Sequence, residues 1–386
     1  MQLSVVILNY NVRYFLETSL LSVQKAIQDL DAEIIVVDNA SSDGSCEMMH
    51  DRFPDVLFIK NEDNVGFPKG NNIGVAKAKG EYICILNPDT VVAEDTFTKI
   101  LSFAESQKNL GIVGCKLIDG SGHFLPESKR GIPTPWIAFT KVIGLYKLFP
   151  SSTWFNQYYA QHVAVDQTSK VAILVGAFML MKRQLYIEMG GFDENCFMYS
   201  DDIDLSYLAL KEGKDNFYFA ETTVIHYKGE STHKDVLFMK RFQEAMTFFY
   251  TKHFKKSVFF TLMMHIGIQL FALKKLIQHN KIHKSIPENH FLYSENKDIE
   301  LKISSQLNKK CVSIHRIEKL KKELKKGTIA PTEIIFDLNY ISYQSMITLM
   351  EECTSFPCTY KILSFQNDFL IGSNHSDDKG EVIILS

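Results

Sequence analysis

The chain has 386 residues and a mass of 44.2 kDa, a length that predicts two domains. An apolar fraction of 46% is that of a globular protein with a sizeable core, and a net charge of −3 argues against a general nucleic-acid binder. The seven scattered cysteines include no CxxC pair, which excludes a structural zinc site and a disulfide framework and favours a reducing compartment.

The chain starts with an apolar run that has no basic residues before it and is too short for a secretory signal peptide. We interpret this run as a buried first strand and expect the protein to be cytoplasmic. Strands then alternate with helices: we predict strands at 3–10, 33–38, 56–61 and 81–87, and helices at 12–29, 41–53 and 70–80. This alternation predicts an α/β fold with a Rossmann-like, mostly parallel sheet and helices on both faces.

The next region, 120–167, has many aromatic residues and poor periodicity, and we expect a long excursion that forms a wall of the site. Further helices are predicted within 183–191, before Gly213, and at 236–254. We therefore place a first domain at 1–250, a connecting segment at 251–288, and a small accessory α/β domain of unknown role at 289–386.

The connecting segment contains no Asp or Glu, apart from Glu288 at its end, and lysines flank its apolar run at 257–273. One polar residue recurs every four positions along this run, which gives a narrow polar stripe on a helix: Ser257, Thr261, His265 and Gln269. The run is short for a membrane span, so we interpret it as a helix lying in an anionic membrane surface. The alternative is a core helix packed between two domains.

The first candidate site residue is Asp38 in VVDNASSDGS, at the end of the second predicted strand. It either caps a turn or makes the first ligand contact at the carboxyl edge of the sheet. The second candidate is the loop NVGFPKGNNIG, where Gly66, Gly70 and Gly74 occur four residues apart. This loop either lets the backbone approach a ligand or is only a helix-entry turn, and it is neither a P-loop nor a dinucleotide-binding fingerprint.

The third candidate is LNPDT, in which Asp89 follows a strand and a proline-containing turn. Its carboxylate suits a divalent cation, although an Asx turn explains the same residues. The fourth is FMYSDDIDLS, where Asp201, Asp202 and Asp204 begin a helix. Three acids exceed what capping needs, and their mutual repulsion raises at least one pKa toward the range useful for a base. His226 ends a later strand as either a structural histidine or a metal ligand.

These motifs, together with GAFMLMKR, GGFDENCFMYSDDIDLS and VIHYKGES, resemble glycosyltransferase family 2 in their order and spacing. Members of this family are inverting, nucleotide-sugar-dependent enzymes of the GT-A fold. The resemblance covers residues 3–250 and is strongest to the rhamnosyltransferase-like branch of surface-polysaccharide assembly.

The resemblance implies a role for each matching position. Asp38 is expected to hydrogen-bond the nucleotide base, Asp202 to act as the general base, and Asp201 to help orient the acceptor. Asp89 and His226 are expected to hold Mg²⁺ or Mn²⁺. The other positions implied in nucleotide-sugar binding are Tyr10, Asn11, Asn64, Gly66, Gly70, Asn71, Asn72 and Asn87.

Three departures from the family pattern affect these expectations. Asn87 replaces the first acid of the usual Asp-x-Asp, so only one carboxylate is available there for the cation. Asp201 replaces a common Glu, and Pro68 and Lys69 stand where small residues are usual.

The implied reaction is a single displacement at the anomeric carbon, from a UDP-, dTDP- or GDP-linked sugar to a glycan or lipid-linked acceptor hydroxyl. We expect the protein to act in cell-envelope polysaccharide synthesis, peripherally on the inner face of the cell membrane. A non-catalytic nucleotide-binding scaffold is the alternative, motivated by Asn87 and the extra domain. A nucleotidyltransferase is disfavoured because ILNYNVRYFLE offers no glycine-rich triphosphate loop.

Overall fold

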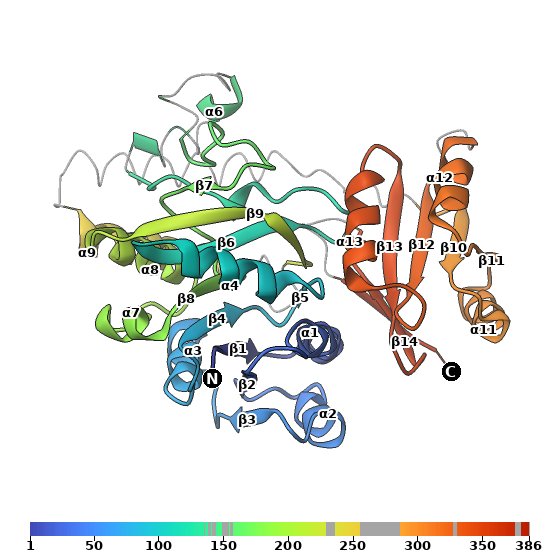
Figure 1. The fold of residues 1–386 in the computed structure, drawn as a ribbon, viewed down its shortest axis with the longest axis horizontal. Helices are drawn as coiled ribbons and strands as arrows, with labels where there is room; N and C mark the ends of the chain where they lie inside the picture. Colours follow the sequence, from blue (N-terminus) through green and yellow to red (C-terminus); the bar gives the residue numbers. More distant parts are fainter. Residues whose placement is uncertain are drawn as a thin grey trace.

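The computed structural model describes residues 1–134, 136–137, 140, 144–148, 154, 157–228, 236–254, 286–326, 330–374 and 380–385. These residues form two α/β domains side by side, each built on its own sheet (Figure 1). The expected fold class is confirmed: the first sheet is mostly parallel in its amino-terminal half and has helices on both faces, and a smaller α/β domain follows.

The first sheet has the strand order β3-β2-β1-β4-β8-β6-β9-β5, with β7 paired to β9. Its strands are β1 (Leu3–Asn9), β2 (Ala32–Asp38), β3 (Leu57–Lys60), β4 (Tyr82–Leu86), β5 (Thr90–Val91), β6 (Leu110–Ile118), β7 (Ser169–Lys170), β8 (Phe178–Lys182) and β9 (Asp215–His226). Strands β1 to β4 are parallel, and β8 is antiparallel to both β4 and β6. The chain passes from β1 outward to β3 and then returns to the other side of β1 as β4, so β1 and β4 flank a topological switch point.

The helices of the first domain are α1 (Arg13–Ala26), α2 (Ser45–Arg52), α3 (Phe67–Val75), α4 (Thr96–Ser106), η1 (Pro126–Ser128), α6 (Leu145–Leu148), α7 (Arg183–Glu188), α8 (Asp201–Lys211) and α9 (Val236–His253). One face of the sheet packs against α1, α2 and α4, and the other against α3, α7 and α8. All seven residues of β1 are buried, as its continuous apolar run predicts.

Two boundaries differ from the sequence prediction for local reasons. Helix α2 begins at Ser45, because Gly44 has a φ of 83° and the Asp43 side chain accepts from the amides of Arg13 and Ser45. Helix α3 begins at Phe67, because Pro68 has no amide hydrogen to leave unsatisfied in a first helical turn. The central strand β6 and helix α4 were not predicted.

The second domain has the strand order β11-β10-β12-β13-β14-β15, parallel from β11 to β13 and antiparallel beyond. Its elements are β10 (Asn289–Tyr293), α11 (Lys297–Leu307), β11 (Cys311–Ser313), α12 (Ile317–Lys326), β12 (Thr332–Asp337), α13 (Tyr343–Glu352), β13 (Cys358–Leu363), β14 (Phe369–Gly372) and β15 (Glu381–Ile384). Helix α11 covers one face of this sheet, and the other face packs against α13 and the first domain.

The predicted surface helix at 257–273 lies outside the described residues. Helix α9, which is described and leads toward it, packs its aromatic side chains against α8. Among the helices that are described, none has the length and apolar character needed to cross a bilayer.

Candidate functional site

The loops that follow β1 and β2 are joined by hydrogen bonds at the carboxyl edge of the sheet. Asn9 Nδ2 donates to Asp38 Oδ1 at 2.7 Å and to Ser41 Oγ at 3.1 Å. Asn11 has a φ of 55°, and its side-chain oxygen accepts from the Ser42 amide at 2.8 Å. Tyr10 and Asn11 therefore lie in a loop that hydrogen bonds hold against the loop after β2.

Asp38 lies at the end of β2, where the sequence predicts it, and is fully buried. Its Oδ2 accepts from the Ser41 amide at 2.8 Å, and the Cys46 thiol lies 3.6 Å from the same oxygen. Burial and the nearby Asp38 charge raise the pKa of the Cys46 thiol. Both oxygens of Asp38 thus organise the loop, and its contact with a nucleotide base stays a prediction.

The glycine spacing in NVGFPKGNNIG is explained by packing. A side chain at Gly70 would meet Leu8 at 2.4 Å, and one at Gly74 would meet Val6 at 2.5 Å. These two glycines therefore let α3 lie directly on β1. Gly66 has a φ of 84° and packs against the backbone of Phe197, whose oxygen accepts from the Phe67 amide at 3.0 Å.

The three asparagines of this loop have different surroundings. Asn64 is exposed and accepts from the Gly66 amide at 3.0 Å, which leaves it at the rim of the carboxyl edge. Asn71 is buried, and its side chain donates to the Phe67 oxygen at 2.9 Å. Asn72 faces away from this edge, because it donates to the Phe192 oxygen and to Glu194, each at 2.9 Å.

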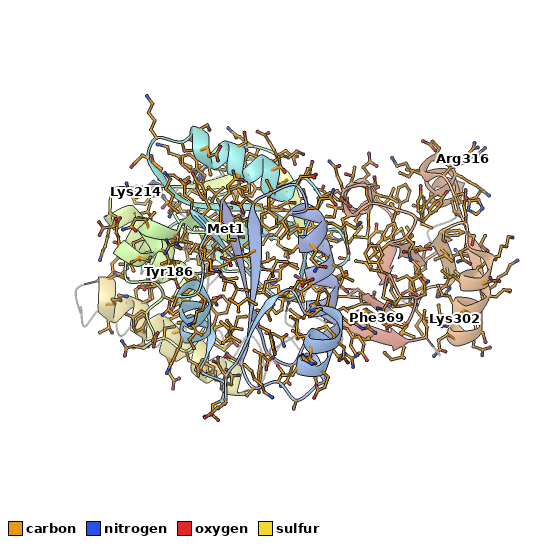
Figure 2. All side chains as sticks on the ribbon, turned by 60° about the horizontal axis from the view of Figure 1, so that its bottom comes forward. Met1, Tyr186, Lys214, Lys302, Arg316 and Phe369 are labelled. Atoms are coloured by element: carbon orange, nitrogen blue, oxygen red, sulfur yellow. The ribbon has the colours of Figure 1, made fainter. Side chains whose placement is uncertain are left out.

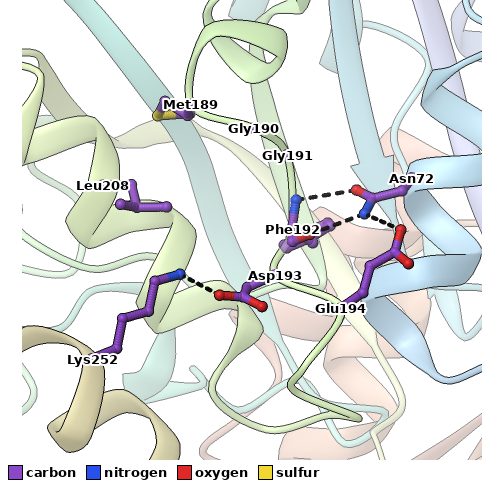
Figure 3. A pocket seen from close by; sticks show the side chains of 9 residues that line it. All are labelled: Asn72, Met189, Gly190, Gly191, Phe192, Asp193, Glu194, Leu208 and Lys252. Carbon is purple, nitrogen blue, oxygen red and sulfur yellow. Dashed lines mark hydrogen bonds and ion pairs between the residues drawn. The ribbon is translucent and has the colours of Figure 1, made fainter.

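A pocket of about 320 Å³ lies beside Asn72, between α8, α9 and the turn after α7 (Figure 3). Its lining residues are Asn72, Met189, Gly190, Gly191, Phe192, Asp193, Glu194, Leu208 and Lys252. The figure shows Asn72 bonded to Phe192 and Glu194, and Lys252 paired with Asp193 at 2.7 Å. Asn72 is the only lining residue that the sequence analysis selected, so this pocket is separate from the predicted acids.

Asn87, Asp89 and His226 meet at the switch-point side of the sheet, and we call this group the cation corner. His226 Nε2 lies 3.4 Å from Asp89 Oδ1 and 3.3 Å from Asn87 Nδ2. The antiparallel pairing of β5 with β9 places Thr90 opposite His226. This pairing brings Asp89 and His226, which are 137 positions apart in the chain, into contact. Within the described residues, Asn87 Oδ1 and His226 Nδ1 are buried and have no hydrogen-bond partner.

Asp201 and Asp202 begin α8, and with Arg130 they form what we call the acid corner. Arg130 Nη2 donates to Asp202 Oδ2 at 2.6 Å, and the Gly176 amide donates to the same oxygen at 3.0 Å. The side chain of Asp202 is 13% exposed and that of Arg130 is 10% exposed, so this is a nearly buried ion pair. Arg130 also donates to the Leu174 oxygen at 2.6 Å, which fixes its orientation.

The surroundings of Asp201 shift its pKa. Its burial and the adjacent charge of Asp202 raise the pKa of Asp201 to about 7. The sequence prediction of like-charge repulsion within this cluster is therefore confirmed for Asp201. The Arg130 charge opposes this effect, and the pKa of Arg130 itself is raised by Asp202 despite burial.

Residues 176–177, directly before β8, join the two corners. The Asn87 amide donates to the Ala177 oxygen at 3.0 Å, while Gly176 donates to Asp202, so consecutive residues contact the two groups. The four predicted positions are thus distributed as follows: Asp89 and His226 touch, Asp202 lies just across residues 176–177, and Asp38 ends β2, which β1 separates from β4.

Sequence reasoning missed the charged residues of PESKR in the excursion. Glu127 forms an ion pair with Lys228, two residues beyond His226. Burial would raise the pKa of Glu127, but the charge and hydrogen bond of Lys228 lower it below its ordinary value. The only sequence signal was a cluster of charges inside an aromatic-rich region. The excursion supplies Arg130, which contacts Asp202.

The residues that suit a divalent cation are few. Among the described residues, no cluster of three or more His, Cys, Asp and Glu side chains is arranged to hold a metal ion. Asp89 offers a carboxylate oxygen and His226 an imidazole nitrogen as ligands, and the Asn87 amide oxygen is buried beside them. Such a partial set fits a cation whose remaining ligands come from phosphate and water, as is usual for Mg²⁺.

Residues 4–190 match the model of glycosyl transferase family 2. The matched range includes the switch point, Asn87 and Asp89 of the cation corner, and Arg130 of the acid corner. The amino-terminal domain belongs to this family. The family and the glycosyltransferase class predicted from the sequence are therefore confirmed. The match ends before α8 and His226, so it does not cover Asp201, Asp202 or His226, and their roles stay predictions.

Two relatives and one solved structure illustrate this family 2 glycosyltransferase domain. The N-acetylglucosaminyl-diphospho-decaprenol L-rhamnosyltransferase of Mycobacterium tuberculosis is 26% identical over 244 residues, which are 60% of this chain and 78% of that protein. Rhamnosyltransferase WbbL of Escherichia coli is 27% identical over 171 residues, 42% of this chain and 61% of that protein. The mannosyltransferase PcManGT of Pyrobaculum calidifontis, solved with GDP-Man and Mn²⁺, has a TM-score of 0.45 and 18% identity, covering 70% of this chain and 69% of that one.

Proposed function

We propose that this glycosyltransferase transfers a sugar, with inversion, from a nucleotide-sugar donor to the hydroxyl of a lipid-linked or polysaccharide acceptor in cell-surface glycan synthesis. The observation that carries the proposal is the proximity of the two corners: the His226–Asp89 pair and the Asp202 carboxylate, which is paired with Arg130, contact consecutive residues of the segment 176–177. A displacement at an anomeric carbon needs these two kinds of group, one for the leaving diphosphate and one for the attacking hydroxyl.

Asp202 is the proposed general base. Arg130 and the Gly176 amide hold its Oδ2, and its Oδ1 has the nearby Ile203 amide at 2.7 Å as a donor. In the reaction Asp202 takes the proton of the acceptor hydroxyl as that oxygen bonds to the anomeric carbon. The bond to the diphosphate oxygen breaks in the same step, so the configuration inverts.

Asp89 and His226 are the proposed residues for a divalent cation, with Asn87 in the position beside them. Bound there, Mg²⁺ or Mn²⁺ supplies positive charge that stabilises the departing nucleoside diphosphate. Lys228, which pairs with Glu127, lies two residues beyond His226 and adds a second positive charge near the same edge. The loops of Asp38, Asn64 and Gly66 are proposed to hold the nucleotide, with Tyr10 and Asn11 at its border.

Turnover of nucleotide sugars tests the reaction. Purified protein is incubated with Mn²⁺, a polyprenyl-diphosphate-sugar acceptor and a panel of UDP-, dTDP- and GDP-sugars. Release of the nucleoside diphosphate is expected with one donor and is expected to fall strongly in Asp202→Asn. Full activity in Asp202→Asn would show that the assigned base is wrong. The matched control is Asp204→Asn, because Asp204 is also buried and ion-paired, to Lys252 at 2.8 Å.

A cysteine next to Asp38 allows a direct test of the nucleotide pocket. Cys46 is half-buried, while the other six cysteines are buried. Alkylation of Cys46 is measured at pH 8.5, where a larger fraction of the thiol is ionised than at pH 7. We expect this alkylation to slow when the matching nucleoside diphosphate binds. Equal alkylation rates with and without UDP, dTDP and GDP would place the base elsewhere. The variant Cys46→Ser identifies the labelled site.

A non-catalytic scaffold is the second candidate, because Asn87 removes one carboxylate from the cation corner. Binding of UDP, dTDP or GDP in calorimetric titrations, without turnover of any sugar donor, would favour it. The decaprenol in the name of the Mycobacterium relative supports a lipid-linked acceptor. The lysines that flank residues 257–273 support contact with an anionic membrane. Flotation with anionic vesicles tests that contact: the full chain is expected to float, and a variant with 252–284 deleted is expected to remain unbound.

A further inference from the structure

A single apolar core joins the second domain to the first. It contains residues of α1, β5, β6 and β9 from the first domain and of α13, β13 and β14 from the second. Figure 1 shows α13 facing the ends of β5 and β9, and Figure 2 labels Phe369 on the side of the second domain that faces α1. The Phe369 ring lies 4.9 Å from that of Tyr14.

Polar contacts surround this core. Both oxygens of Glu94 accept from backbone amides at the start of α13, those of Tyr343 and Gln344, each at 2.8 Å. Lys116 pairs with Glu351 at 2.8 Å. An apolar centre with a polar rim is the anatomy of a specific interface. The second domain therefore packs directly against the first.

The interface lies directly behind the cation corner. Side chains alternate along a strand, so Ile225 and Tyr227 both enter the interdomain core while His226 between them points to the opposite side. The Tyr227 amide donates to the backbone carbonyl oxygen of Asp89 at 3.0 Å, and Val91 is the ladder partner of Ile225. The ribbon of β5 and β9 thus has the second domain on one face and the cation corner on the other.

A second contact leads to the acid corner. A side chain at Gly122 would meet the Met350 oxygen at 2.6 Å, and one at Gly120 would meet the Ser373 oxygen at 2.7 Å. The turn after β6 therefore lies against the second domain without space between them. This turn leads within a few residues to Glu127 and Arg130, which carry the charges beside His226 and Asp202.

We propose that the second domain is a positioning element of the transferase site: it holds the β5–β9 ribbon and the turn after β6, and through them Asp89, His226 and Arg130. This inference rests on the proposed function for the roles of those residues. A two-residue strand such as β5 forms too few ladder hydrogen bonds to be held by its own pairing. The second domain therefore supplies the packing that keeps β5, and with it Asp89, in position.

Two truncations in the second domain separate positioning from simple destabilisation. Met350→Ala removes a side chain at the interdomain core, and Ile303→Ala removes one at the opposite face of the same sheet, under α11. Both residues are at most 1% exposed, so both variants loosen the domain. Hydrogen exchange of the full chain is measured at the Tyr227 amide, and Mn²⁺ affinity is measured from the free-ion electron paramagnetic resonance signal.

Met350→Ala is expected to speed exchange at Tyr227 about tenfold relative to Ile303→Ala and to weaken Mn²⁺ binding by about the same factor. Equal exchange at Tyr227 in the two variants would overturn the proposal. If Met350→Ala does not fold, Glu351→Gln, which removes the pair with Lys116, takes its place with the same expectations. If the wild-type chain binds no Mn²⁺, the cation assignment of the proposed function fails, and the exchange comparison alone decides the positioning role.

Discussion

The cation corner and the acid corner contact consecutive residues, Ala177 and Gly176, yet they differ in how their polar side-chain atoms are hydrogen-bonded. In the acid corner Arg130, Gly176 and Ile203 all donate to Asp202. In the cation corner, within the described residues, Asn87 Oδ1 and His226 Nδ1 are buried and have no partner. Arg130 Nε is also buried without a partner among the described residues, so the contrast concerns Asp202, whose two oxygens both accept hydrogen bonds from the protein. The cation corner has the incomplete bonding expected where a ligand supplies the rest.

This difference has a physical reason. Burying a carboxylate is costly unless it is paired, and Arg130 provides that partner for Asp202 within the chain itself. A cation site at a leaving group can remain partial, because the diphosphate brings its own oxygens. The comparison therefore predicts large effects in the acid corner and smaller, metal-dependent ones in the cation corner.

The largest expected effect is that of Asp202→Asn. Loss of a general base lowers kcat by about 10²–10⁴-fold, while the amide retains the volume of the side chain. Steady-state turnover with the best donor measures it. The same donor KM in both proteins would show that the pocket is intact, and an unchanged kcat would remove Asp202 from the mechanism.

Arg130→Met breaks the acid corner from the other side. It leaves Asp202 as a buried, unpaired charge, which is expected to lower the free energy of unfolding by about 3–5 kcal/mol. Urea denaturation measures this loss. In variants that remain folded, kcat is expected to fall, since the Asp202 carboxylate loses the guanidinium that orients it. The double variant Arg130→Met/Asp202→Asn is expected to regain part of the stability, which a purely steric role of Arg130 would not produce.

In the cation corner, Asn87→Asp restores a second carboxylate. Affinity for Mn²⁺ is expected to rise about tenfold, because ligand charge governs the binding of hard cations. His226→Ala is expected to weaken Mn²⁺ binding by a similar factor, and His162→Ala, at an exposed position, is the control. Identical Mn²⁺ affinities in Asn87→Asp and wild type would separate this corner from the metal.

The smallest effect concerns pH and Asp201. Because the folded-state pKa of Asp201 is about 7 and its ordinary value is 3.8, folding retains a proton that the unfolded chain has lost. Stability is therefore expected to fall as pH rises from about 4 through 7 and to level off above, and roughly 3 kcal/mol of this fall lies between pH 5 and 8. Thermal unfolding at pH 5 to 8 measures this fall, which Asp201→Asn should remove. An equal pH dependence in both proteins would show that Asp201 titrates normally.

The sequence by itself determined most of the first domain and its chemical class. The strands ending at Asn9, Asp38 and Leu86 were predicted because buried parallel strands are continuous apolar runs, and their polar ends mark the edge where ligands bind. The motifs around Asp89 and Asp202 identified the family. Spacing in the glycine loop was ambiguous, because packing on β1 and approach to a ligand select the same residue at Gly70.

Only the tertiary structure decided which charges face one another. Nothing local in PESKR indicates that Arg130 pairs with an acid 72 positions later, since that contact depends on where the excursion returns to the sheet. The position of the second domain behind β5 and β9 was not predicted either, because it depends on how the apolar surfaces of the two domains fit together. Apolar periodicity records that a face is buried, but the identity of the partner surface is set when distant segments meet.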